Sequence, residues 1–191
     1  QRDNYPVPTD GHLIDDVSVF APAPTNGQPS RPGIAAFDIN NAINVNSSLV
    51  STGDGGPYFA SAIQGGAFNL GFDAGGNQAI AVVYGALNVA SATFPGGIGQ
   101  FDIGGPGVDL NGIPLNVGIF VDAISWAQGG SIGLPVDSLF FTNAAGILDV
   151  TFAFPFLGVP SGTVLTTFQS AITTSGAPFV YLSNAVEVTI N

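Results

Sequence analysis

Short apolar runs alternate with turn-forming residues along most of the chain. The runs are rich in Val, Ile, Phe, Ala and Thr, recur about every ten residues and are separated by clusters of Gly, Pro and Asn. This spacing predicts an all-β protein, a single β-sandwich of jelly-roll-like type. The strands we expect most clearly are Ala79–Tyr84, Ile98–Ile103, Leu115–Val121, Ser138–Thr142, Ile147–Phe152, Thr163–Phe168 and Ala185–Ile190.

Two of these runs carry further information. In the last run, Val186, Val188 and Ile190 share one face of the expected strand, so this strand has one buried and one exposed side. Pro155 interrupts the apolar run that continues Ile147–Phe152. Proline cannot donate to a strand ladder, so it predicts a sheet edge or a bend at that point.

Residues 1–33 differ from the rest of the chain. They hold six of the 14 prolines and every basic side chain, and they include one strand-like segment, 13–20. The Pro-rich stretch 21–33 is expected to be extended, with a reach of roughly 40 Å at about 3.1 Å per residue. We therefore divide the chain into an N-terminal arm (1–33) and a sandwich domain (34–191). Segment 13–20 then either joins the sheet of a neighbouring molecule or forms an ordinary first strand.

Composition favours an assembled state. Only 8% of residues are charged while 46% are apolar, so the chain packs a core but has less surface charge than a soluble monomer usually needs. Neighbouring copies would cover the surplus apolar surface. The net charge of −11 argues against nucleic-acid partners, and no apolar run is long enough to predict a membrane-spanning helix.

The start of the sequence suggests processing. The chain begins with Gln1 and contains no Met, so we expect a trimmed N-terminus. Removal of a secretory signal peptide is the first interpretation and removal of a purification tag the alternative. The first interpretation predicts a secreted protein at the cell surface or outside the cell.

Residues with catalytic chemistry are scarce. No His, Lys or Arg follows residue 33 and no Cys occurs at all, which argues against Ser–His–Asp, phosphate-loop and zinc chemistry. A carboxylate pair for glycoside hydrolysis is conceivable, but turns and solvated strand faces explain the same residues better. We expect no enzyme. The carboxylates considered were Asp102, Asp109, Asp122 and Glu187.

Three binding features remain open at this level. Residues 38–41 and 109–112 offer oxygen ligands for calcium without the spacing of a calcium loop, so a turn is favoured and calcium stays undecided. Trp126, the single tryptophan, is either packed in the core or a platform for sugars, which Tyr58, Tyr84 or Tyr181 would extend. Asn46 begins a glycosylation sequon.

Taken together, the processed end, the strand-bearing arm, the Gly/Thr/Val-rich sandwich and the few charges resemble the secreted all-β subunits of bacterial and archaeal extracellular fibres. Donor-strand complementation joins those subunits. The resemblance implies a structural subunit of a non-covalent filament or pilus, a homopolymer whose donor strand is carried by the arm. Its donor residues would be Leu13, Ile14, Val17, Val19 and Phe20, with Leu13, Val17 and Val19 filling a groove of the next subunit.

The sequence departs from this resemblance in one respect. It contains no lysine, which excludes isopeptide cross-links through Lys. The alternative function is a secreted carbohydrate-binding, lectin-like module that uses Trp126 to contact surface glycans. A third is a capsid or decoration protein, because jelly-roll shells have a similar number of strands.

Overall fold

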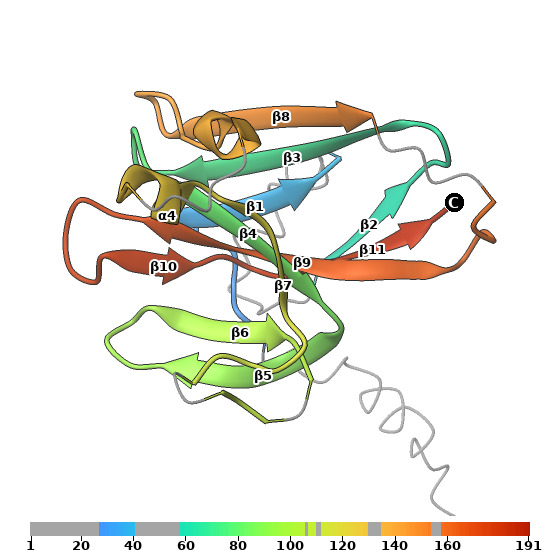
Figure 1. Ribbon diagram of the computed structural model, residues 1–191, viewed down its shortest axis with the longest axis horizontal. Coiled ribbons are helices and arrows are strands. Elements are labelled where there is room, and N and C mark those ends of the chain that lie inside the picture. Colours follow the sequence, from blue (N-terminus) through green and yellow to red (C-terminus); the bar gives the residue numbers. More distant parts are fainter. Residues whose placement is uncertain (1–26, 41–57, 106, 110–111, 130–134, 154–157) are drawn as a thin grey trace, which may run out of the picture.

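The computed structural model describes residues 27–40, 58–105, 107–109, 112–129, 135–153 and 158–191. These residues form an all-β, sandwich-like fold with very little helix, as the sequence predicts. The sheets lie in three layers (Figure 1). The expected donor segment 13–20 and the sequon at Asn46 lie outside the described residues.

The middle layer is a six-stranded sheet. Its order is β2-β11-β9-β4-β7, and β10 also pairs with β9. The pairs are antiparallel except for β2 and β11, which run parallel. The bounds of these strands are β2 (Tyr58–Ala62), β4 (Ile80–Gly85), β7 (Gly118–Asp122), β9 (Val164–Thr173), β10 (Val180–Leu182) and β11 (Val186–Ile190).

A three-stranded antiparallel sheet covers one face of the middle layer. Its order is β1 (Ala35–Ile39), β3 (Ala67–Ala74) and β8 (Ile147–Ala153). The larger of the two apolar cores lies between these sheets. It contains a ring contact between Phe37 and Phe72, whose centroids are 5.0 Å apart, and both side chains are fully buried or nearly so.

A hairpin forms the third layer, on the opposite face of the middle sheet (Figure 1). It consists of β5 (Leu87–Phe94) and β6 (Gly99–Ile103). Adjacent residues of β4 contact different cores, because successive side chains of a strand point to opposite faces. Val82 is fully buried in the larger core and Val83 packs against the smaller core under the hairpin.

Most expected strands are confirmed, including β11 with its alternating burial. The strand expected at Ser138–Thr142 is wrong. Its first two residues belong instead to the 3-10 helix η2 (Pro135–Leu139). Asp137 explains the difference. Its carboxylate accepts from the Asp122 N–H at 3.1 Å and its carbonyl accepts from the Phe140 N–H at 3.1 Å. The chain is therefore wound at this point, while Phe140 still reaches the core.

A short helix, α4 (Ala123–Ala127), also interrupts the strands. The sequence analysis did not predict it, because five residues are too few for a helical period to stand out. The Asp122 carboxylate caps it by accepting from the Ser125 N–H at 3.0 Å. Within the described ranges, no helix has the length and apolar character that crossing a membrane requires.

Candidate functional site

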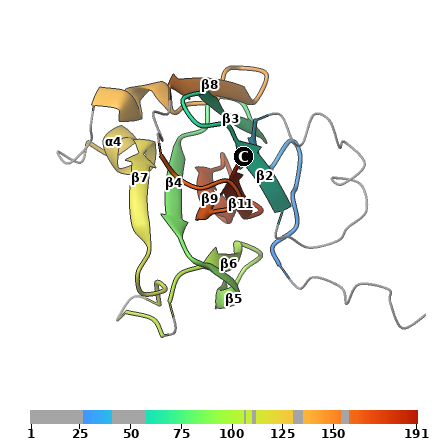
Figure 2. The ribbon, with the colours of Figure 1, turned by 90° about the vertical axis from the view of Figure 1, so that its right-hand side faces the viewer.

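The most distinctive feature of the fold is the unpaired edge at β8. This strand is seven residues long and pairs only with β3 among the described residues. It lies at the outer end of its layer, with β7 and α4 on the same side of the molecule (Figure 2). The strand is thus an edge strand of its sheet. The edge or bend expected at Pro155 itself lies outside the described residues.

The inward side chains of β8 are less buried than those of its neighbour β3. In β3, the inward residues Phe68, Leu70 and Phe72 are each no more than 2% exposed. Their register partners in β8, Phe152, Val150 and Leu148, pack against the same core but are only partly buried. Among the described residues, the core is thus closed in the middle of the sheet and only partly covered along β8. An inner row of this kind is what an additional strand would cover.

The backbone of β8 is also available on that side. Ala74 donates to the Gly146 carbonyl at 2.9 Å, and antiparallel pairs alternate between bonded and non-bonded residues. The alternation directs the backbone groups of Asp149, Thr151 and Ala153 away from β3. No strand among the described residues pairs with them there.

Phe120 links the opposite sheet to this edge. The pairing of β4 with β7 shifts between Val82 and Val83, which makes Phe120 the extra residue of a β-bulge. Its ring makes edge contacts with Phe152 at 5.7 Å and with Phe168 at 5.8 Å between centroids. Phe120 is itself partly buried, so both walls of the core are incomplete on this side.

The other end of the middle sheet is different. Strand β2 is also an edge strand, but its inward residues are the small Ala60 and Ala62, which are buried. Its outward residue Phe59 is 66% exposed. A strand added at β2 could pair with its backbone groups, but it would not cover a row of large, partly buried apolar side chains like that of β8. The edge of β8 therefore offers more apolar surface to a partner strand.

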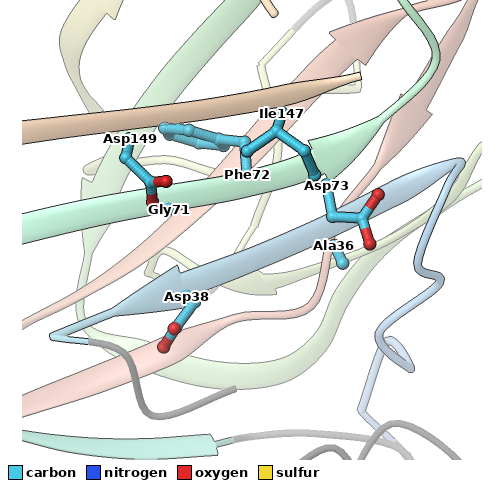
Figure 3. A pocket seen from close by; sticks show the side chains of 7 residues that line it. All are labelled: Ala36, Asp38, Gly71, Phe72, Asp73, Ile147 and Asp149. Carbon is cyan, nitrogen blue, oxygen red and sulfur yellow. The ribbon is translucent and has the colours of Figure 1, made fainter. Parts of the chain in front are cut away.

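A second surface feature is a cavity of about 130 Å³ on the outer face of the three-stranded sheet. Asp38 and Asp149 flank Gly71 in one cross-strand row, and Asp73 lies in the neighbouring row. Figure 3 shows that the three carboxylates do not converge on one point. Among the residues that the structure describes, no three acidic, His or Cys side chains are placed to hold a metal ion. We assign no ligand to this cavity.

The aromatic residues considered for sugar binding do not form one platform. Trp126 is 45% exposed and makes an edge contact with Phe141 at 5.7 Å. Tyr84 packs its ring over Gly118 in the middle sheet, whereas Tyr181 lies under the guanidinium of Arg31. Tyr58 accepts from the Ser30 N–H at 3.4 Å. Each of the three tyrosines thus contacts another part of the fold. None of them makes a ring contact with Trp126, so the four aromatic residues do not form one sugar-binding surface.

The final residues of the arm are fixed to the domain. Gln28 and Ser30 are only 5% and 7% exposed. The Arg31 guanidinium donates to the carbonyls of Leu182 (2.9 Å), Ile98 (3.1 Å) and Gly97 (3.3 Å), and it lies 4.7 Å from the centre of the Tyr181 ring. Burial lowers the pKa of Arg31 from its ordinary value, yet the group keeps its charge at neutral pH.

Asp102 binds the same segment through a hydrogen bond from the Gln28 backbone. This carboxylate is fully buried and accepts from the backbone N–H of Gln28, from the Ala90 N–H at 2.9 Å and from the Gln100 side chain at 3.0 Å. Burial raises its pKa, and these three hydrogen bonds partly offset the rise. Gly99 leaves room for the Gln28 side chain, because a Cβ there would lie 2.6 Å from Gln28 Oε1. We call Gln28, Arg31 and Asp102 the arm anchor.

The sequence analysis missed both the partly buried row of β8 and the arm anchor. For β8, the proline at 155 indicated a sheet edge or a bend, but no signal in the sequence indicated the partial burial of the row. For the anchor, the signal was an Asp between Phe101 and Ile103, since a buried carboxylate inside an apolar strand needs donors. Comparisons of the chain with protein-family models, with curated proteins and with solved structures give no match.

Proposed function

We propose that this protein is the structural subunit of a non-covalent extracellular filament, in which each subunit donates its N-terminal strand to a neighbour. The observation that supports this most is the edge of β8, where the core row of Leu148, Val150 and Phe152 is only partly buried. The β8 edge also has outward-directed backbone groups. Strand addition uses both features, main-chain hydrogen bonds for affinity and side-chain contacts for specificity.

The candidate donor fits this edge in length. Segment 13–20 has eight residues and β8 has seven. Leu13, Val17 and Val19 lie on one face of an extended segment, because side chains alternate with period two. Each such side chain contributes roughly 1.5–3 kcal/mol when fully buried, so the three together offset part of the cost of ordering the strand. Asp15 shares this face and weakens the match.

The low charge of the surface supports the same proposal. Several large apolar side chains remain exposed on the described part of the chain, with Phe179 at 75%, Ile63 at 71% and Phe59 at 66%. Association would remove the apolar surface of these side chains from water. A filament on the outside of the cell would place these residues between copies.

The experiment uses a substitution that blocks the edge without changing the core. Thr151 is exposed, and its N–H points away from β3. Thr151→Pro therefore removes a donor that the incoming strand needs while the bonds to β3 remain. Thr151→Ala is the matched control, since it removes only the hydroxyl that accepts from Asn69 Nδ2 at 3.2 Å.

We expect the wild-type chain and Thr151→Ala to form filaments visible by electron microscopy, and Thr151→Pro to stay monomeric with a cooperative melting transition. Filaments of Thr151→Pro equal in amount to those of the wild type would show that β8 is not the accepting edge. A wild-type chain that stays monomeric at all concentrations tested would refute the filament itself.

A further inference from the structure

A row of three side chains crosses the middle sheet on the face that the hairpin partly covers. Val186 and Val188 are buried in the larger core, so Glu187 between them points to the opposite face. Glu187 pairs with Phe59 of β2 on one side and with Thr167 of β9 on the other. Residues directly opposite each other on paired strands share one face. We call Phe59, Glu187 and Thr167 the outer row.

The hairpin covers this face only as far as the outer row. Gln169 lies two residues from Thr167 on the same face of β9. Its Nε2 donates to the Gln100 carbonyl at 2.9 Å, and its Oε1 accepts from the Asp102 N–H at 2.9 Å, so the hairpin holds it. In Figure 1, β11 and β2 lie beyond the end of the hairpin. Thr167 pairs with Gly85, which has no side chain to fill the space beside it.

A groove of about 440 Å³ opens at this place, a size within the range of small-molecule sites. Leu87 and Val164 give it apolar walls, and Thr167 and Glu187 also line it. Thr167 is 1% exposed, and its hydroxyl has no hydrogen-bond partner among the described residues. A buried hydroxyl without a partner is costly. A molecule in the groove that bonds this hydroxyl would remove that cost.

The chemistry of the outer row selects the class of ligand. The Glu187 carboxylate accepts hydrogen bonds and donates none, whereas the Thr167 hydroxyl does both. Glu187 and the net charge of −11 disfavour an anionic ligand. Phe59 is 66% exposed and offers the face of an apolar ring beside Glu187. A sugar ring has adjacent hydroxyls for a carboxylate and a C–H face for an aromatic ring. An organic cation fits less well, because one ring does not form an aromatic cage.

We propose that the groove beside the outer row binds a neutral sugar residue. Glu187 accepts hydrogen bonds from adjacent sugar hydroxyls, Thr167 bonds a further hydroxyl, and the ring of Phe59 packs on the apolar face of the sugar. This site differs from Trp126, which lies in α4 after β7, at the other end of the middle sheet. It goes beyond the proposed filament and does not depend on it. Phe59 is thereby assigned to the sugar, which leaves Ile63 and Phe179 for contacts between copies.

The test begins with an array that carries neutral and sialylated glycans side by side. The full chain is then titrated with the neutral glycan that it binds best. Glu187→Gln should weaken binding about tenfold or more, since hydrogen bonds to a charged group are strong. Phe59→Ala should weaken it about fivefold or more. The matched control is Phe179→Ala, which removes a ring that is 75% exposed outside the outer row. It should leave the affinity within about twofold of the wild type.

Thr167→Val separates sugar binding from folding. It keeps the shape of the side chain and removes the hydroxyl, which has no partner among the described residues. The melting temperature should therefore stay the same or rise, while the affinity for the sugar should fall about fivefold. A melting temperature lowered by about 5 °C or more would show that the hydroxyl is bonded within the fold, which would overturn its role in binding.

Three other results would overturn the inference. They are an array on which no neutral glycan is bound, binding that Glu187→Gln leaves unchanged while Trp126→Ala abolishes it, and loss of assembly instead of glycan binding in Phe59→Ala. The last result would identify the outer row as a contact between copies. The proposed function is tested separately: a wild-type chain that binds the neutral glycan but never assembles would refute the filament and leave the sugar site standing.

Discussion

The side chain of Asn184 completes the hydrogen bonding of Phe37 as a strand would. Asn184 Nδ2 donates to the Phe37 carbonyl at 2.9 Å, and Asn184 Oδ1 accepts from the Phe37 N–H at 3.0 Å. Asn184 is fully buried and precedes β11, whereas Phe37 lies in the middle of β1. One amide thus pairs the middle of the β1 edge. At the β8 edge of the same sheet, Asn143 pairs with Ile147 at the start of the strand, and no described strand pairs with the residues that follow.

Asn184→Ala should therefore destabilise the fold by about 2–4 kcal/mol, because the N–H and carbonyl of Phe37 would both lose their partners in a buried place. Urea unfolding of the variant measures this change. Asn69→Ala is the control: it removes the bond to Thr151 on the outer face and should cost about 1 kcal/mol or less. Equal losses of unfolding free energy in the two variants would show that the buried Asn184 pairing stabilises the fold no more than the Asn69–Thr151 hydrogen bond does.

Closure of one edge and openness of the other were not both predictable from sequence. The strands at 147–153 and 186–190 could be predicted because apolar residues alternate there or form a compact run. Their positions in the sheets depend on partners distant in sequence, such as Ala60 opposite Val188. Asn184 carries no signal of its own, since an Asn beside a strand predicts a turn as readily as a buried amide.

At the candidate site too, one feature could be predicted from the sequence and another could not. Pro155 pointed to an edge at the end of the run now seen as β8, because proline is tolerated only where a donor is not needed. The partial burial of Val150 could not be predicted, since in sequence it looks like any core valine. The 3-10 helix at Pro135–Leu139 was missed for a related reason: the apolar residues there fit a strand, and Asp137 sets the turn through contacts with Asp122 and Phe140.

The buried carboxylate of Asp102 predicts a pH dependence of stability. Burial raises its pKa above the ordinary value of 3.8, so the folded protein binds this proton more tightly than the unfolded chain does. The contribution of Asp102 to stability is then greatest below the unfolded pKa and declines as the pH rises through the folded pKa. Other carboxylates also titrate there, so the comparison is between the wild type and Asp102→Asn.

Urea unfolding from pH 4 upward should show a steeper fall of stability in the wild type than in Asp102→Asn, which carries no proton at this position. The variant should also be less stable overall at pH 4, because an amide cannot accept from Gln28, Ala90 and Gln100 at once through both of its former oxygens. Parallel pH profiles for the two proteins would show that Asp102 does not titrate in this range.

Two adjacent aspartates in the donor segment provide the sharpest test of how the strand is oriented. Asp15 shares the face of Leu13, Val17 and Val19, whereas Asp16 lies on the other face of an extended segment. Burying a carboxylate against the apolar row of β8 is costly. Asp15→Val should therefore strengthen assembly and lower the protein concentration that it requires by about tenfold, equivalent to about 1.4 kcal/mol.

Asp16→Val is the matched control, because it makes the same chemical change and removes the same charge one residue away. It should leave the required concentration within about twofold of the wild type, since in the proposed pairing this residue would face away from the β8 row. Sedimentation across a dilution series measures both variants. If the two substitutions strengthen assembly equally, loss of charge is the cause, and the proposed facing of Leu13, Val17 and Val19 toward the β8 row is wrong. If only Asp16→Val acts, the opposite face of the segment, with Ile14 and Phe20, is the one that binds.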